Sequence, residues 1–389
     1  MNVKISAVSF FVVLLIASLL LMANVFVVTH FEGHLEGLFL FKNKQTGQFT
    51  LTDHLLVGNE KQLIYALNFR NNSYRMVSRL FPHHKEGVDH LHVEWHPKDG
   101  SGLVSSYFAD GTGLVTYLGR YLDAEEEVHG LFVGGGLPET VESNVAYNMN
   151  NSGMTYYDGK RWYHIWCSVN EGIVNPLTGN SFTPSKWEFL GSRVEKRSDS
   201  NVIITSSHRI AINQVPLKID RKMSFTAGEP YLNLDIKVTN TGTVPVNFNY
   251  LYGDEPWVGY YGTSLGDVGW TSDGIVEYET FVDTKTHSFI GMADLGNRLI
   301  GERPVYTNLA DFIEWPQEAR PDRAYFINDQ NKMPQKGTKV PLESNERFLG
   351  VEWQRTLQPA ESTTFRLAIG MAPFNPANGR PQKPNTTWK

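Results

Sequence analysis

Residues 89–96, with the sequence DHLHVEWH, contain four side chains that can bind a transition metal. Alternate side chains of a β-strand point to opposite faces of its sheet, so a strand here would separate these four from three apolar residues. The apolar residues are Leu91, Val93 and Trp95, and the metal-capable residues are His90, His92, Glu94 and His96. The alternation predicts a strand with one buried face and one face able to do chemistry.

The chemistry that this face could supply is metal binding. Imidazole is a good ligand for zinc or copper, and His90 and His92 lie close enough on one strand face for a single ion to reach both. Residues four apart on a strand are about 13 Å apart, so a complete site would need a ligand from another strand. The candidates are His83, His84, His129 and His164. Two alternatives stay open: a ligand groove without metal, and a polar face with a structural role only.

A second candidate group lies in residues 252–262, YGDEPWVGYYG, where two adjacent acids precede three aromatic residues. The carboxylates of Asp254 and Glu255 could accept hydrogen bonds from sugar hydroxyls, and an aromatic ring such as that of Trp257 could pack against the C–H face of a sugar. The two acids could also ligate calcium through oxygen. The remaining interpretation is an exposed acidic turn anchored in the core by its aromatic residues.

Composition excludes some classes of function. The chain has 389 residues, of which 41% are hydrophobic and 20% charged, enough for one large domain or two ordinary ones. The formal net charge is -6, so there is no overall basic character to attract nucleic acid, and no nucleic-acid partner is expected. The single cysteine, Cys167, excludes a disulfide within the chain.

The N-terminus predicts a membrane segment. Residues 5–28 contain no charged side chain, and about 20 apolar residues suffice to cross a bilayer. We expect residues 1–29 to form a cytoplasmic stub and an uncleaved signal-anchor transmembrane helix, with a cleaved signal peptide as the alternative. Lys4 is the only charged side chain before the apolar run, so the positive-inside tendency places the N-terminus in the cytoplasm. The expected location is the cell membrane, with a single span and the ectodomain outside the cytoplasm.

The rest of the chain has the pattern of β-strands. Residues 231–239 alternate apolar and polar side chains, an NTG turn follows, and the alternation resumes at Val244, which predicts a hairpin over residues 231–252. Asp-Gly pairs mark further turns, and helical periodicity is scarce. The expected fold class is all-β, with a large sandwich. The expected divisions are an N-terminal β-rich part at 30–200, a sandwich part at 201–374 and a loose, Pro- and Asn-rich tail at 375–389.

Part of this β-rich sequence resembles a known group. Residues 206–259 have an arginine-containing strand, a short turn, an alternating strand that ends in V-T-N-T-G, and a strand leading onward to "YGDEPWVG". In residues 348–370, the acid Glu352 precedes the turn Leu357-Gln358-Pro359-Ala360-Glu361. Over roughly residues 200–370 the chain resembles the galactose mutarotase-like superfamily, in which an acidic residue precedes an L-x-P-G-E turn.

The resemblance implies a β-supersandwich with a carbohydrate-facing groove on one concave sheet. In the epimerases of this group a glutamate acts as general base and a histidine as general acid at the anomeric centre of a sugar. Glu352 matches the glutamate, whereas residues 252–257 stand where the group places its histidine. The catalytic candidates are therefore Glu352, Asp254 and Glu255, and the candidate substrate contacts are Trp257, Tyr252, His208 and Arg209.

These observations leave three classes of function. The leading hypothesis is a membrane-anchored extracytoplasmic protein that binds or modifies a carbohydrate or polysaccharide. The second is a metal-binding protein or metalloenzyme centred on His90 and His92, with zinc, copper or calcium as the metal. The third is a structural subunit of a membrane or envelope assembly. In each case the lipid bilayer is a partner through the N-terminal helix, and other membrane-complex subunits are partners in the third.

Overall fold

The structure is a computed structural model of the chain. It describes residues 37–43, 49–52, 61–68, 73–75, 87–97, 100–122, 128–133, 153–158, 162–166, 168–182, 184–256, 258–259, 267–294, 307–329, 332–335, 337–342 and 347–388. The predicted membrane segment at residues 5–28 and the candidate contact Trp257 lie outside these ranges. Within them, no helix combines the length and apolar character needed to cross a bilayer.

Contacts divide the chain into two compact units. The first comprises Met1–Pro82 and Thr140–Asn148, and the second comprises His83–Glu139 and Met149–Lys389. The described strands of the first unit form one antiparallel sheet in the order β2-β1-β3-β4. These strands are β1 (Gly37–Asn43), β2 (Phe49–Thr52), β3 (Lys61–Asn68) and β4 (Ser73–Arg75).

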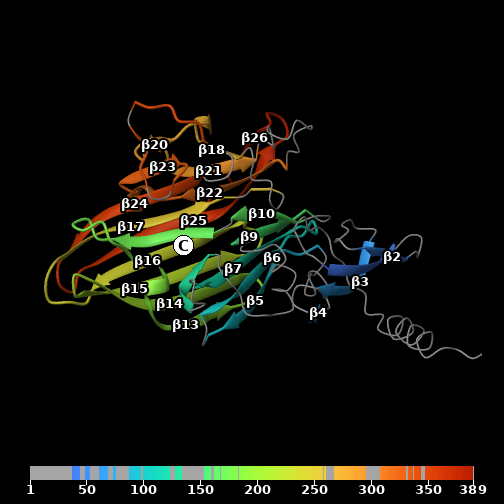
Figure 1. Ribbon diagram of the computed structural model, residues 1–389, viewed down its shortest axis with the longest axis horizontal. Coiled ribbons are helices and arrows are strands. Elements are labelled where there is room, and N and C mark those ends of the chain that lie inside the picture. The colour runs from blue at the N-terminus through green and yellow to red at the C-terminus, as the bar shows by residue number, and fades with distance from the viewer. Residues whose placement is uncertain are drawn as a thin grey trace, which may run out of the picture. The chain divides into compact units, whose positions relative to one another are not determined.

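The largest sheet of the second unit has ten strands, in the order β13-β14-β15-β16-β25-β22-β21-β18-β19, with β26 paired to β25 (Figure 1). All of its pairings are antiparallel. Its strands are β13 (Glu188–Arg197), β14 (Asn201–Ile212), β15 (Val215–Thr226), β16 (Tyr231–Asn240), β25 (Ser362–Asn375), β22 (Leu309–Glu314), β21 (Phe289–Asp294), β18 (Asp267–Thr271), β19 (Gly274–Val276) and β26 (Arg380–Pro381).

Two six-stranded antiparallel sheets complete the second unit. The facing sheet has the order β12-β11-β17-β24-β23-β20, and the third sheet has the order β10-β9-β7-β6-β5, with β8 paired to β7. The strands of the facing sheet are β11 (Ser168–Val174), β12 (Ser181–Phe182), β17 (Val246–Glu255), β20 (Thr280–Val282), β23 (Arg323–Ile327) and β24 (Phe348–Leu357). Those of the third sheet are β5 (His90–His96), β6 (Ser101–Tyr107), β7 (Gly113–Leu122), β8 (Val128–Val133), β9 (Met154–Tyr157) and β10 (Trp162–Trp166).

Apolar residues of all three sheets pack into one core, so the all-β sandwich prediction is confirmed. The ring of Phe365 from the ten-stranded sheet lies 5.0 Å from Tyr250 and 4.7 Å from Trp353 of the facing sheet, measured between ring centroids. Leu91 and Val93 of β5 lie in the same core and Trp95 packs against it, which confirms the strand predicted at residues 89–96. In the described residues the helical elements are two short 3-10 turns, η1 (Pro184–Lys186) and η2 (Gln317–Ala319).

The predicted hairpin over residues 231–252 is wrong, although both of its strands exist. β16 pairs with β15 and β25 in the ten-stranded sheet, whereas β17 pairs with β11 and β24 in the facing sheet. The buried Asn240 holds the crossing, because its side-chain nitrogen donates to the carbonyls of Val244 (2.8 Å) and Leu357 (3.0 Å). Alternation predicts that each strand buries one face. The apolar faces of β16 and β17 are both buried, but they face each other across the core instead of lying side by side in one sheet.

Two features differ from the expected divisions of the chain. A boundary at residue 200 would fall in the connection between β13 and β14, which pair along eight positions of one sheet. The C-terminal residues, expected to be loose, are held on the ten-stranded sheet: β26 pairs with β25, and the Thr387 amide donates to the hydroxyl of Tyr231 (3.0 Å).

Candidate functional site

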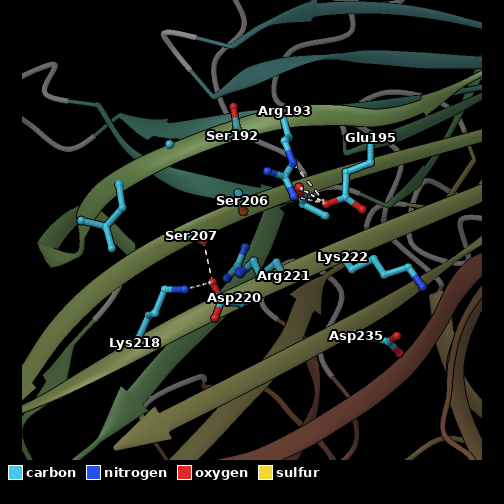
Figure 2. A pocket seen from close by; sticks show the side chains of 13 residues that line it. Ser192, Arg193, Glu195, Ser206, Ser207, Lys218, Asp220, Arg221, Lys222 and Asp235 are labelled. Carbon is cyan, nitrogen blue, oxygen red and sulfur yellow. Dashed lines mark hydrogen bonds and ion pairs between the residues drawn. The ribbon is translucent and has the colours of Figure 1, made fainter. Parts of the chain in front are cut away.

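The ten-stranded sheet has an inner face, which contributes to the core, and an outer face turned away from it. β14 and β15 alternate strictly, so every second side chain of each lies on the outer face. Over β13 to β16 this outer face contains a hollow of about 590 Å³ (Figure 2). The polar residues that line it are Ser192, Arg193, Glu195, Thr205, Ser206, Ser207, Lys218, Asp220, Arg221, Lys222 and Asp235.

Register aligns these side chains in rows across the strands. One row runs through Arg193, Thr205, Lys222, Asp235 and Arg366, each opposite the next on a neighbouring strand. Directly opposed side chains of antiparallel strands lie roughly 5 Å apart at their Cβ atoms. The row therefore presents guanidinium, hydroxyl, ammonium and carboxylate groups in turn over five strands.

Asp220 is the centre of a small hydrogen-bonded group in the hollow. Its Oδ1 accepts from the Ser207 hydroxyl (2.5 Å) and from the Lys218 ammonium (2.8 Å). At the rim, Arg193 Nη2 lies 2.6 Å from Glu195 Oε1. Lys222, by contrast, forms no ion pair or hydrogen bond with the other residues of the hollow, as Figure 2 shows.

The candidate contacts His208 and Arg209 lie on opposite faces of β14 and cannot touch one ligand. Arg209 is on the outer face, two residues beyond Ser207, where its Nη1 lies 3.0 Å from Glu188 Oε2. His208 is on the inner face and fully buried. Burial, together with the nearby positive charge of Arg221, lowers the pKa of His208 well below its ordinary value, so this imidazole is neutral at pH 7.

The candidate contact Tyr252 also lies inside the sandwich, beside a buried ion pair that joins two sheets. Arg221 of the ten-stranded sheet pairs with Glu171 of the facing sheet, and both side chains are almost completely buried. The Tyr250 hydroxyl donates to Glu171, and the Arg221 guanidinium lies 5.2 Å from the centroid of the Trp187 ring. Burial raises the pKa of the Tyr252 phenol, so Tyr252 belongs to an internal polar group rather than to a surface site.

The three catalytic candidates are not brought together. Glu352 lies opposite Leu251 on the face of the facing sheet that points away from the core, whereas Asp254 lies on the inner face, three residues further along β17. Glu352 accepts hydrogen bonds from Asn249 (3.3 Å), Gln354 (2.9 Å) and Arg323 (3.4 Å). Glu255 shares the face of Glu352 but is about 13 Å along the strand from Leu251. Asp254 and Glu352 therefore cannot act as an acid–base pair on one substrate.

Asp254 instead belongs to a buried acid cluster that the sequence did not reveal. Its other members are Asp267, Asp294, Asp311 and the guanidinium of Arg347, which lies 2.9 Å from Asp267 Oδ2. Burial is the main cause that raises the pKa of Asp267 to about 7, with Arg347 opposing it and Asp294 adding to it. Burial and the negative charge of Asp254 raise the pKa of Asp311 well above its ordinary value.

The histidine strand shows no metal arrangement in the part of the chain that is described, where no group of three His, Cys, Asp or Glu side chains is placed to hold an ion. His90 stacks on Tyr107, with ring centroids 4.7 Å apart, and its Nδ1 lies 2.8 Å from the Val88 carbonyl. His92 Nε2 lies 3.5 Å from Glu94 Oε1. Burial lowers the pKa of His164 to about 3. The side chains of His96 and His129 lie outside the described residues, so zinc, copper and calcium binding stay predictions.

Comparison with known proteins gives distant structural likenesses. No protein-family model and no curated protein matches the chain. Among solved structures, the galactosidase domain of alpha-galactosidase-sucrose kinase matches 72% of this chain and 42% of its own, at 8% identity and a TM-score of 0.38. The alpha-galactosidase from Lactobacillus brevis matches 75% of this chain and 40% of its own, at 10% identity and a TM-score of 0.32. This chain therefore spans less than half the length of either galactosidase.

A galactose mutarotase-like protein from Lactobacillus casei matches 72% of this chain and 99% of its own, at 8% identity and a TM-score of 0.32. This solved structure carries the name of the superfamily that residues 200–370 resemble in sequence, and its similarity to the chain is weak. Likeness at this level assigns no role to any residue. The chain is thus an all-β sandwich protein with a distant similarity to galactose mutarotase-like structures.

Proposed function

We propose that the protein binds a carbohydrate in the hollow on the outer face of the ten-stranded sheet. The observation that supports this function is the row of alternating donors and acceptors from Arg193 to Arg366, with the Lys222 ammonium unengaged within the hollow. Each sugar hydroxyl can donate one hydrogen bond and accept others, so a surface with both kinds of group in register suits several hydroxyls of one ligand.

The charges of the hollow favour a ligand without a large net charge. The cationic side chains on its outer-face positions, Lys218, Lys222 and Arg193, are matched by three acids, and the fourth cation of its lining, Arg221, is buried and pairs with Glu171. The acids are Asp220, Asp235 and Glu195. A site built for a polyanion would have an excess of cations, and a site built for an apolar molecule would be lined mainly by apolar and aromatic side chains. The volume of about 590 Å³ lies within the usual range of small-molecule sites.

The proposal covers binding, with chemical modification of the sugar as the finer alternative. The resemblance of Glu352 to the epimerase base supports modification, but Glu352 lies on the facing sheet and does not line the hollow, so this alternative needs a site other than the hollow. We also propose that the second unit lies outside the cytoplasm, held at the cell membrane by residues 5–28. The uncharged length of that segment and the position of Lys4 support this location.

The test is oligosaccharide binding by the full chain in detergent micelles, first on a glycan array and then by titration calorimetry. Replacement of an ionic hydrogen-bonding group typically costs 1.5–3 kcal/mol, so Lys222→Ala should weaken binding by about tenfold or more. Asp235→Asn should also weaken it, because the acceptor loses its charge. Lys285→Ala, which removes an exposed lysine in the turn before β21, is the matched control and should bind like the parent. Absence of any glycan ligand, or equal binding by all variants, would contradict the proposal.

A further inference from the structure

The C-terminal residues cover part of the same outer face. Next to the polar hollow, the ten-stranded sheet has an apolar region on this face that includes Tyr231, Phe289 and Phe312, and Trp388 packs against it. Among residues 382–388 Trp388 is the only large apolar side chain. The segment is otherwise held by polar contacts, which a ligand could replace one by one.

The most specific of these contacts surrounds Lys383. Its ammonium lies 2.8 Å from Glu314 Oε2, 5.5 Å from the ring centroid of Phe312 and 5.8 Å from that of Phe289. The Lys383 and Glu314 side chains are 14% and 12% exposed, so the pair is largely withdrawn from water. Two aromatic faces and one carboxylate around a partly desolvated ammonium group are the chemistry by which proteins recognise cationic ligands. We call Glu314, Phe289 and Phe312 the ammonium cage.

The apolar region that contains Phe289 and Phe312 also includes Tyr231, and β16 connects it to the hollow. Successive outer-face positions of this strand are Asp235, Asn233 and Tyr231, spaced by roughly 7 Å. Asp235 lines the hollow, whereas the Asn233 side chain donates to the Thr387 carbonyl (3.0 Å) and the Tyr231 hydroxyl accepts from the Thr387 amide (3.0 Å). The C-terminal segment therefore begins to cover the face one position beyond the end of the hollow.

We propose that the ammonium cage is a second subsite for the ligand of the hollow, and that it takes the primary ammonium group of a 2-amino-2-deoxy sugar. Lys383 occupies the cage when no ligand is bound, and an extended oligosaccharide that fills both subsites displaces residues 382–388. This inference rests on the proposed function of the hollow and specifies its ligand: a glycan with one free amino group at the sugar that reaches the cage, in preference to the same glycan in N-acetylated form.

The experiment uses calorimetry on the full chain to compare two hexamers: the N-acetylglucosamine hexamer, and the same hexamer with one terminal sugar N-deacetylated, called the amino hexamer. Lys383→Ala empties the cage, and since a desolvated cation–π contact is worth about 2 kcal/mol, affinity for the amino hexamer should rise by roughly tenfold or more. Affinity for the N-acetylated hexamer should stay the same. Lys383→Ala combined with Glu314→Gln should lose the gain, and Lys285→Ala should show none. An equal gain for both hexamers, or no gain for the amino hexamer, would overturn the proposal.

A second measurement uses the unmodified protein, so it does not depend on the folding of a variant. Hydrogen exchange at the Thr387 amide, which Tyr231 protects, should accelerate when the amino hexamer saturates the protein. Unchanged exchange at saturation would also overturn the proposal.

A third probe separates the cage from the carbohydrate hypothesis. n-Butylammonium has no hydroxyl groups, and we expect it to bind to Lys383→Ala but not to the double variant with Glu314→Gln. If it does so while no hexamer binds to any variant, the proposed carbohydrate function fails and the cage remains an ammonium site. If hexamers bind through Lys222 while n-butylammonium and the amino group have no effect, the cage inference fails and the proposed function stands.

Discussion

The interior of the second unit contains two groups of buried charges that differ in their balance. In the first, one guanidinium meets one carboxylate: Arg221 pairs with Glu171, and Tyr250 donates to the same carboxylate. In the second, the acid cluster, Arg347 faces four aspartates. The pKa of Arg221 is raised because Glu171 and its neighbours stabilise the charge against burial. Burial is the main cause that raises the pKa values of Asp267 and Asp311; neighbouring acids add to the rise and Arg347 opposes it.

The balance of charge distinguishes the two buried groups. The balanced pair connects the ten-stranded sheet to the facing sheet; burial raises the pKa of Glu171, and the charge of Arg221 and the hydrogen bond from Tyr250 oppose that rise. The unbalanced cluster remains compatible with the fold when some of its carboxyls are protonated, so its contribution depends on pH. The first group is thus a cross-sheet link, and the second makes the stability of this unit sensitive to pH.

Breaking the balanced pair should give the largest effect. Arg221→Met leaves Glu171 as a buried carboxylate without its cation, and removal of one partner of such a pair typically costs about 3–5 kcal/mol. The measurement is the free energy of unfolding in urea at pH 7. The double variant Arg221→Met/Glu171→Leu removes both charges and should recover most of the loss. A single variant that unfolds at the same urea concentration as the parent would show that the link adds nothing.

The unbalanced cluster predicts a loss of stability as the pH rises from acid through neutral. Asp267 has a folded-state pKa of about 7 against an ordinary value of 3.8, so the fold favours its protonated form. The associated stability is fully present below pH 3.8 and is lost as the pH rises through about 7, a difference of roughly 4 kcal/mol at most. The buried His164 and His208 act in the opposite direction, because their pKa values are lowered and they oppose folding only below about pH 6.5.

Above about pH 6.5 the two buried histidines no longer change the stability, so a measurement there reports on the acid cluster. We expect the thermal midpoint of the parent to fall between pH 6.5 and 8.5, and Asp311→Asn to show a smaller fall. The asparagine oxygen can still accept the hydrogen bond that Met292 donates to Asp311 Oδ1 (2.5 Å), so the substitution removes charge and little else. Asp322→Asn, at a half-exposed acid outside the cluster, should retain the slope of the parent. A parent midpoint that rises with pH in this window would contradict the assignment.

The sequence predicted the strands of this fold better than it predicted their neighbours. The alternation of residues 231–239 places Leu234 and Ile236 in the core as expected, but a period of two does not state which strand lies alongside. β16 and β17 consequently looked like a hairpin, whereas they belong to different sheets.

The candidate site was predicted only in part, for similar reasons. Residues 217–223, LKIDRKM, show a polar face at every second position, but the sequence does not show that this face is hollowed or that Arg221 points to the core. The side chains of the acid cluster come from β17, β18, β21 and β22, which are separate in the sequence, so no local motif predicts the cluster. A signal that could have suggested it is Asp311, which stands between apolar residues in the sequence LADFI of β22.

The smallest effect on stability is expected on the outer face, where charges meet water. Lys218 and Asp220 form an ion pair with side chains 43% and 34% exposed, and such pairs contribute about 0–1 kcal/mol. Lys218→Ala should therefore change the urea midpoint little, in contrast with Arg221→Met three residues further along the same strand. It should nevertheless weaken oligosaccharide binding, because the hollow loses a donor beside Asp220. A large loss of stability from Lys218→Ala would mean that the outer face stabilises the sheet. It would contradict the view that the inner face of β15 serves stability and its outer face serves binding.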